Sequence, residues 1–197
     1  RPGSVVKELL ENAFDAGATV VTVEIQGGGL TYIRVTDNGC GIAPEDAKTA
    51  FLRHATSKIV SERDLEAIGT LGFRGEALAA IAAVSRVDLL TRVRGAEAGV
   101  SLSLEGGVPG ELLPAGCPEG TTIIVRDLFF NTPARMKFMK RDTAEGAYIG
   151  SLVQQLALSH PEVSVKLIRN GEEQMHTPGD GRLLSSIYSA LGREIAL

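Results

Sequence analysis

The sequence predicts an α+β fold in which helices cover one face of a mixed, mainly antiparallel sheet. Three observations lead to this prediction. Apolar residues at helical spacing open the chain, alternating apolar runs follow in pairs joined by glycine-rich turns, and helices and hairpins then succeed one another irregularly. The chain has 197 residues, 44% hydrophobic and 22% charged, so one domain with the edge of a second is expected.

The first fifty residues supply the clearest elements. Apolar residues recur every three or four positions over 4–16, and Gly17 offers a stop, so a helix is expected there. Two alternating runs, 20–25 and 30–37, are expected to pair as a hairpin across three glycines. Proline followed by two acidic residues predicts a short helix over 44–51.

The remainder alternates between helices and strands. Residues 52–73 are polar and irregular apart from a helical piece near 64–68, and a helix of small residues is expected over 74–84. Glycines and prolines predict a loop between 105 and 121, and Thr132 with Pro133 predicts a helix start. Further strands are expected at 86–93, 99–105, 121–127, 163–168 and 172–175, with helices at 143–158 and from 182 onward.

Composition excludes several classes of protein. No run approaches the ~18 consecutive apolar residues of a membrane helix, and no charged-then-apolar leader opens the chain. Two cysteines without a CxxC pattern fit neither a disulfide framework nor a zinc site, which favours a reduced compartment. The net charge of −4 gives no argument for nucleic-acid binding, and we attribute the basic cluster at 126–141 to a solvated helix face.

The polar face of the helix at 4–16 is the first candidate site. It carries Glu8, Glu11, Asn12 and Asp15, with Glu8 and Asn12 one turn apart on the same side. A solvated helix face would account for four polar residues. Asparagine is nevertheless a poor residue inside a helix, and a Glu–Asn pair at this spacing can position a water molecule and a hard cation together.

A second candidate follows the strand at 30–37. Asp37 is followed by Asn-Gly-Cys-Gly-Ile, a DxGxG pattern that is also ordinary turn chemistry. A carboxylate there can accept a hydrogen bond from the amino group of a base, and the glycines allow close approach of the backbone to a ligand.

Two glycine-rich stretches complete the set. Glycines at 69–75 lead directly into a helix start, where free N–H groups and the positive end of the helix dipole favour phosphates; a tight turn is the alternative. No Walker A pattern occurs, so a P-loop protein is excluded. Thr121 opens a strand after Gly120, where its hydroxyl can support a base site.

In this order the four segments resemble the ATP-binding motifs of the GHKL superfamily, which includes gyrase-type topoisomerases, heat-shock chaperones, histidine kinases and MutL. Several stretches resemble the MutL-type DNA mismatch repair proteins, above all FRGEAL and NTPAR. The resemblance covers nearly the whole chain. The stretches that carry it are VVKELLENAFDAGAT (5–19), TDNGCGI (36–42), RHATSKI (53–59), LGFRGEALAAI (71–81) and DLFFNTPARMKF (127–138).

The resemblance implies a GHKL (Bergerat-type) ATPase fold and a role for each matching residue. Glu8 corresponds to the general base, Asn12 to the Mg²⁺ ligand, Asp37 to the adenine-reading carboxylate and Thr121 to its support. Residues 56–58 correspond to a nucleotide lid and 72–78 to a phosphate cradle. The residues expected to bind ATP are Asn12, Asp37, Gly39, Gly41, Ile42, Thr56, Ser57, Lys58, Gly72, Phe73, Arg74, Gly75, Glu76, Ala77, Leu78 and Thr121.

The resemblance also implies an architecture and partners. Residues 1–178 are expected to form the ATPase domain, without the arm that precedes it in relatives, and 179–197 a helix leading to a second domain. Without the arm and that domain's phosphate-contacting lysine, we expect the chain alone to be a monomer that hydrolyses ATP weakly. Expected partners are a MutS-type mismatch-recognition protein, a downstream nuclease or helicase, a second MutL-type subunit, and DNA mainly through other regions.

We expect such a protein in the bacterial cytoplasm, or in the nucleus if it is eukaryotic, and not in a membrane. Two other functions remain open. One is the ATPase half of a type II topoisomerase, which FRGEAL and NTPAR disfavour. The other is a nucleotide-binding module that docks partners with little turnover, which Glu8 disfavours because binding alone needs no base.

Overall fold

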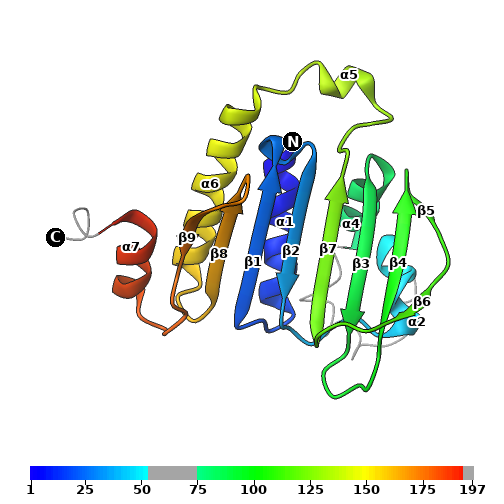
Figure 1. Cartoon of the computed structure of the whole chain (residues 1–197), viewed down its shortest axis with the longest axis horizontal. Coiled ribbons are helices and arrows are strands. Elements are labelled where there is room, and N and C mark those ends of the chain that lie inside the picture. The colour runs from blue at the N-terminus through cyan, green and yellow to red at the C-terminus, as the bar shows by residue number, and fades with distance from the viewer. Residues whose placement is uncertain (53–74, 193–197) are drawn as a thin grey trace, which may run out of the picture.

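A nine-stranded sheet forms the centre of the structure, a computed structural model that describes residues 1–52 and 75–192 (Figure 1). Its strand order is β5-β4-β3-β7-β2-β1-β8-β9, with β6 also paired to β4. Among these described strands only β1 and β8 run parallel. The strands are β1 (Val20–Gln26), β2 (Tyr32–Asp37), β3 (Arg86–Arg92), β4 (Gly99–Glu105), β5 (Val108–Pro109), β6 (Leu113–Ala115), β7 (Gly120–Arg126), β8 (Ser164–Arg169) and β9 (Glu172–His176).

The long helices lie together behind the sheet in the view of Figure 1, which confirms the predicted α+β class with helices on one face. Helix α1 crosses behind β1 and β2, with α4 and α6 on either side of it. The helices are α1 (Pro2–Asp15), α2 (Pro44–Ala47), α4 (Gly75–Ala83), α5 (Pro133–Met136), α6 (Asp142–Ser159) and α7 (Leu183–Leu191), with 3₁₀ turns η1 (Gly27–Gly29) and η2 (Thr49–Phe51).

Cross-strand rows of aliphatic side chains fill the layer between sheet and helices. Successive residues of a strand point to opposite faces, so residues in register on neighbouring strands share a row. Two such rows run across five strands and are buried throughout. They consist of Val23, Val35, Ile123, Leu89 and Leu102, and of Ile25, Ile33, Val125, Val87 and Leu104.

Three local predictions differ from the structure. The helix expected over 44–51 is divided into α2 and η2. The loop expected between 105 and 121 contains the short strands β5 and β6, which carry Pro109 and Pro114 at the outer side of β4, where a missing N–H is tolerated. Thr132 precedes α5 as expected, but its side chain makes no capping hydrogen bond. The helical piece predicted near 64–68 lies outside the described residues.

Helix α7 falls within the segment predicted to lead to a second domain. It lies beside α6 at the β9 edge of the sheet, and Ala190 packs against the core (Figure 1). The domain boundary itself remains a prediction. Among helices in the described parts of the chain, none combines the length and apolar character needed to span a membrane.

Candidate functional site

One row of the helix-facing side of the sheet is polar where its neighbours are aliphatic. Asp37 on β2 pairs with Thr121 on β7, and Thr121 pairs with Thr91 on β3; Val21 and Val100 flank the three in the same register. This polar row lies where β2 and β3 end and β7 begins, at the lower edge of the sheet in Figure 1. Polar side chains facing a core are costly unless they are hydrogen-bonded, so the exception marks a candidate site.

Asp37 is held in place by the backbone around it. The Gly39 N–H donates to Asp37 Oδ1 at 2.8 Å. Burial raises the pKa of the Asp37 carboxyl above its ordinary value, while the N–H groups of Gly39 and Thr121 act in the opposite direction by stabilising the charged form. The structure therefore places a partly desolvated acceptor at the end of β2, where the sequence predicted the base-reading carboxylate.

Thr91 was not among the residues predicted from the sequence. Its hydroxyl oxygen accepts a hydrogen bond from the Ile42 N–H at 2.8 Å, donates to the Gly120 carbonyl at 3.0 Å, and lies 3.0 Å from the hydroxyl oxygen of Thr121. The alternation of Val87, Leu89 and Thr91 contained the signal, because it puts a hydroxyl at an inward position of a strand.

The turn after Asp37 is packed tightly between α1 and β3. The Cys40 N–H donates to the Ala16 carbonyl at 2.9 Å, and the Cys40 carbonyl accepts from the Arg94 N–H at 3.1 Å. Gly41 has a φ of +76°, and a Cβ there would overlap the Arg92 carbonyl oxygen. The glycine at 41 is therefore required by close approach to the protein's own backbone.

Gly39 is constrained in a similar way, since a Cβ would come within 2.8 Å of both Ala16 Cβ and the Ala16 carbonyl oxygen. Asn38 fixes the start of β1, because its side-chain oxygen accepts from the N–H groups of Thr19 and Val20 at 2.8 and 3.0 Å. The turn is thus rigidly placed, and direct ligand contacts by Gly39, Gly41 and Ile42 remain predictions.

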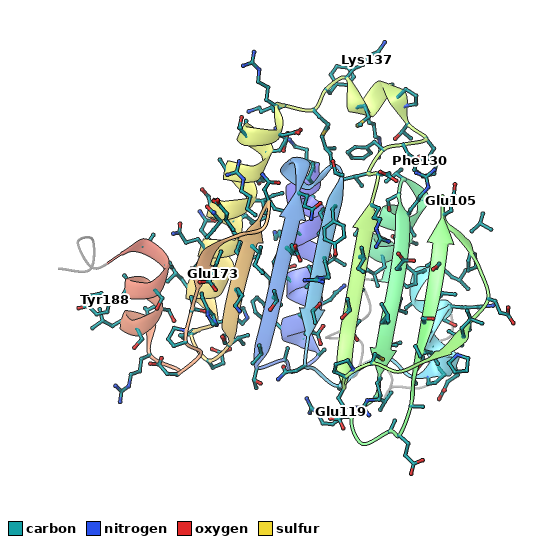
Figure 2. All side chains as sticks on the ribbon, in the orientation of Figure 1. Glu105, Glu119, Phe130, Lys137, Glu173 and Tyr188 are labelled. Carbon is teal, nitrogen blue, oxygen red and sulfur yellow. The ribbon has the colours of Figure 1, made fainter. Side chains whose placement is uncertain are left out.

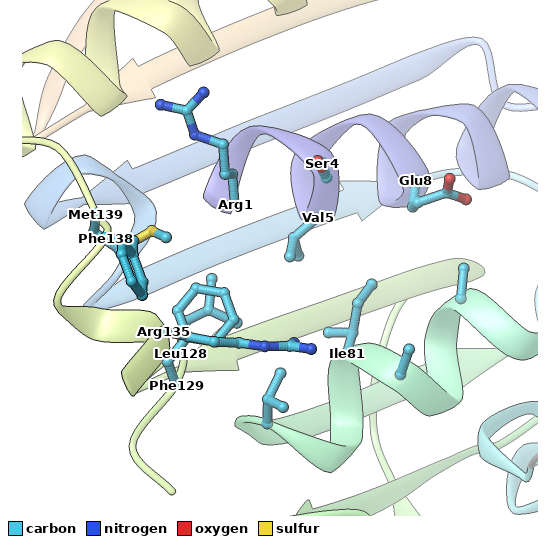
Figure 3. Close-up of a pocket in the computed structure, with 13 residues that line it drawn as sticks. Arg1, Ser4, Val5, Glu8, Ile81, Leu128, Phe129, Arg135, Phe138 and Met139 are labelled. Carbon is cyan, nitrogen blue, oxygen red and sulfur yellow. The ribbon is translucent and has the colours of Figure 1, made fainter. Parts of the chain in front are cut away.

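Glu8 and Asn12 lie on α1, whose apolar residues pack on the sheet. Both side chains are partly buried, and the spacing places them one turn apart. Glu8 borders a cavity of about 380 Å³ between α1, α4 and the segment that contains α5, and Ala77 of α4 also lines it (Figure 3). Glu8, the predicted general base, and Ala77, a residue of the predicted phosphate cradle, therefore line the same cavity.

The rest of this cavity is mainly apolar. Figure 3 shows Arg135 stretched across it from α5, with Phe129 and Phe138 beside it and Arg1 at the start of α1. Phe138 is 82% exposed despite its size. The sequence indicated no role for Arg135 beyond its membership of the NTPAR stretch, and its place in the cavity wall becomes evident only in the structure.

The predicted lid and much of the predicted cradle fall in the part of the chain that the structure does not describe. Thr56, Ser57, Lys58, Gly72, Phe73 and Arg74 lie outside the described residues. Gly75 begins α4, Glu76 is exposed in its first turn, Ala77 lines the cavity, and Leu78 is buried against the core. Within the described parts of the chain, no group of three or more His, Cys, Asp or Glu residues is arranged to hold a metal ion.

The basic cluster at 126–141 does not form one patch. Arg126 makes an ion pair with Asp88, and the neighbouring Asp127 pairs with Arg86 at 2.9 Å. Lys137 lies just after α5, at the far end of the molecule from Glu119 and the polar row (Figure 2). The single solvated helix face predicted for this cluster is therefore wrong, because Arg126 ends β7 and only Pro133–Met136 of the segment are helical.

Comparison with known proteins identifies the family. Residues 1–106 match the family model described as histidine kinase-, DNA gyrase B-, and HSP90-like ATPase. The DNA mismatch repair protein MutL of Agathobacter rectalis is 52% identical over 196 residues, which cover 100% of this chain and 30% of the relative. MutL of Desulforudis audaxviator is 54% identical over 196 residues, covering 100% of this chain and 35% of the relative.

A solved structure agrees with these relatives. The Aquifex aeolicus MutL ATPase domain complexed with ADP has a TM-score of 0.79 and 35% identity, covering 97% of this chain and 68% of that one. The chain spans about a third of the length of the curated relatives it matches. These relatives favour MutL over a type II topoisomerase. The chain belongs to the GHKL ATPases and, within them, is the ATPase domain of a MutL-family protein.

Proposed function

We propose that this domain hydrolyses ATP with Mg²⁺, and that nucleotide-driven closure and dimerisation of the longer protein couple mismatch recognition to downstream repair. The observation that carries the proposal is the polar row, in which a half-buried Asp37 at the end of β2 lies opposite Thr121 on β7. A partly desolvated carboxylate held by backbone N–H groups supports a site that accepts hydrogen bonds from a ligand.

The adenine of ATP would bind at the polar row. Adenine carries a 6-amino group with two N–H donors, and the Asp37 carboxylate is an acceptor. Thr121 lies beside it in register, and Thr91 and Ile42 join the same hydrogen-bonded cluster. A purine with an oxygen at position 6 would present an acceptor to the carboxylate, so the proposal includes a preference for adenine nucleotides.

The phosphates would extend from the polar row toward Glu8 and α4. The N-terminus of α4, which begins at Gly75, offers free N–H groups and the positive end of a helix dipole. Mg²⁺ usually keeps several waters and takes one or two protein oxygens with phosphate oxygens. The Asn12 amide oxygen fits this limited demand, and a bound ion would offset the negative charge of the phosphates.

Glu8 would act as the general base. Its carboxylate accepts a proton from the water whose oxygen attacks the γ-phosphorus, the bond between that phosphorus and the bridging oxygen breaks, and ADP leaves with inorganic phosphate as the second product. Its position at the cavity wall and its spacing of four residues from Asn12 support this assignment. Ala77 of α4 lines the same cavity, which is consistent with a phosphate group between α1 and α4.

The role of the longer protein is part of the same proposal. Because this chain spans about a third of its MutL relatives, coupling to a MutS-type protein, to a nuclease or helicase, to DNA and to a second subunit requires the remaining sequence. The lid residues Thr56, Ser57 and Lys58 and the cradle residues Gly72, Phe73 and Arg74 are proposed to complete nucleotide binding.

A single-turnover experiment tests hydrolysis apart from binding. The chain, in excess over γ-³²P-labelled ATP with Mg²⁺, is expected to retain the nucleotide on a filter and to release labelled phosphate slowly, and EDTA is expected to suppress the release. Retention without release above the uncatalysed rate would support a nucleotide-binding module that docks partners instead. No retention would contradict the proposal as a whole.

A further inference from the structure

We propose that Thr91 is a positioning residue that fixes the Thr121 hydroxyl as a hydrogen-bond acceptor and thereby favours 6-amino over 6-oxo purines. This inference rests on the proposed nucleotide site and deepens it. It concerns a side chain that is only 1% exposed and that reaches the ligand through Thr121.

The contacts of Thr91 account for every hydrogen-bonding position of its hydroxyl. A hydroxyl has one proton to donate and two lone pairs to accept. The Gly120 carbonyl, which is only an acceptor, takes the proton at 3.0 Å. The Ile42 N–H, which is only a donor, takes one lone pair at 2.8 Å. One lone pair remains for the Thr121 hydroxyl, 3.0 Å away.

This count determines the direction of the contact between the two threonines. Because the proton of Thr91 is already engaged by Gly120, Thr121 must donate and Thr91 must accept. The Thr121 hydroxyl then has no proton left, and it presents only lone pairs to a neighbouring group. Two backbone groups, the Gly120 carbonyl and the Ile42 N–H, therefore set the polarity of a side chain in the base site through Thr91.

The consequence is a pair of acceptors side by side. Asp37 and Thr121 are register partners on adjacent strands, and with Thr121 oriented in this way both offer lone pairs. An exocyclic amino group with two N–H donors satisfies both acceptors. A carbonyl oxygen in the same place meets two acceptors and gains a hydrogen bond only if the Thr121 hydroxyl turns, which requires leaving Thr91.

A purely structural role for Thr91 is the competing explanation, and the chain supplies a matched control. Thr177 is 0% exposed, and its hydroxyl accepts from the Val165 N–H at 3.0 Å and donates to the Val163 carbonyl at 3.4 Å. It resembles Thr91 in burial and in backbone hydrogen bonds, but it lies beside β8, where Val165 and Val21 separate it from Asp37.

The test compares ATP with inosine triphosphate, which carries a 6-oxo group, in competition with a fluorescent ATP analogue. Thr91→Val removes the acceptor of the Thr121 proton and frees that hydroxyl to donate. A net hydrogen bond is worth about 0.5–1.5 kcal/mol, so the ratio of inosine triphosphate Kd to ATP Kd is expected to fall about 2- to 10-fold. Thr91→Ser is expected to keep the ratio of the unmodified chain.

Three controls make the result decisive. Thr177→Val is expected to lower the Tm without changing the ratio. If Thr91→Val does not fold, Thr91→Ala serves instead, since it removes the same hydroxyl, and the ratio is expected to shift in the same direction. In a Thr121→Val background, which lacks the hydroxyl, Thr91→Ala is expected to leave the ratio unchanged.

The outcomes separate this inference from the function on which it rests. An unmodified chain that prefers ATP, loses that preference in Asp37→Asn and keeps it in a folded Thr91→Val or Thr91→Ala variant overturns the inference alone. A chain that binds ATP no better than its Asp37→Asn variant, or that does not distinguish ATP from inosine triphosphate, overturns the adenine-reading site and the inference with it.

Discussion

The two ends of α1 present different kinds of site. At its C-terminal end the polar row and its turn are fixed by backbone, through the Ala16 carbonyl, the Gly39 N–H and the register of Asp37 with Thr121. Toward its N-terminal end Glu8 borders a cavity with apolar walls. Under the proposed function, the first end would recognise the adenine and the second would hold the reacting phosphate.

The difference follows from the elements that build each end. Hydrogen bonds between strands fix strand residues relative to one another, and the strands in turn fix the positions of tight turns at their ends. A helix side chain beside a cavity has more freedom, and its environment depends on what fills the cavity. We therefore expect substitutions at the polar row to change binding and substitutions at the Glu8 end to change the chemical step.

The largest effect is expected at Glu8. A positioned general base contributes ~10²–10⁴-fold to a rate, so Glu8→Ala is expected to reduce single-turnover hydrolysis by about that factor. ATP affinity should change little, because a base need not hold the ground-state ligand. Rates of phosphate release and filter-binding affinities are measured on the same preparations.

Glu11→Ala provides the matched control, because it replaces a glutamate on the same polar face of the helix to which no catalytic or ATP-binding role is assigned. Its hydrolysis rate should stay within a few-fold of that of the unmodified chain. Loss of nucleotide affinity in Glu8→Ala, with unchanged turnover per bound ATP, would remove the distinction between the two ends.

Asp37→Asn is expected to have the next largest effect, on binding. The amide can turn an N–H donor toward the donors of adenine, and an unsatisfied buried group costs ~1–3 kcal/mol, or roughly 5- to 150-fold in Kd. Isothermal titration with a non-hydrolysable ATP analogue measures the change. Equal affinities in the unmodified chain and the variant would contradict recognition of the base at this end.

Gly41→Ala tests how far recognition depends on the packed turn. A non-glycine residue at positive φ costs ~1–2 kcal/mol, and here the Cβ would also overlap the Arg92 carbonyl oxygen. Gly95→Ala is the control, because Gly95 has a φ of +83° with no atom within 4 Å of a Cβ. Urea unfolding should show a larger loss for Gly41→Ala, and only that variant should bind ATP more weakly.

Much of this architecture could be predicted from the sequence because local patterns agree with the fold. The periodicity of α1 and the alternation of β1 and β2 predicted elements that the structure confirms within a few residues. The predicted element boundaries were wrong where pairing with a distant strand determines the local structure. The strand β6 forms across Pro114 because β4 offers an edge, which no local pattern reveals.

The site was predictable where a motif is contiguous. Glu8 and Asn12 share a helix turn, and Asp37 ends a strand, so spacing alone suggests their chemistry. Thr91 was missed because its significance depends on register: it lies 30 residues from Thr121 in sequence and 3.0 Å from it in space. Arg135 was missed as a cavity residue for a similar reason, since the approach of α5 to α1 is set by packing.

The smallest effect concerns the pH dependence of stability. Burial raises the pKa of Asp37 above the 3.8 of the unfolded carboxyl, so the folded state disfavours its charged form. The contribution of Asp37 to stability is fully present below the unfolded pKa and is lost as the pH rises through the folded pKa. The amide of the Asp37→Asn variant does not titrate. The free energy of unfolding of that variant minus that of the unmodified chain should therefore increase as the pH rises across this window and level off above it.

The chain contains a control of opposite sign. The Arg182 N–H and other hydrogen bonds lower the pKa of Asp180, so its contribution is present above the unfolded pKa and is lost as the pH falls through the folded pKa. The corresponding difference for Asp180→Asn should therefore become more negative as the pH rises. Urea unfolding over the acidic to neutral pH range, without nucleotide, measures both. Parallel curves for the two variants would show that Asp37 is no more desolvated than a surface carboxylate. The C-terminal end of α1, where adenine is proposed to bind, would then lose the electrostatic feature that distinguishes it from the Glu8 end.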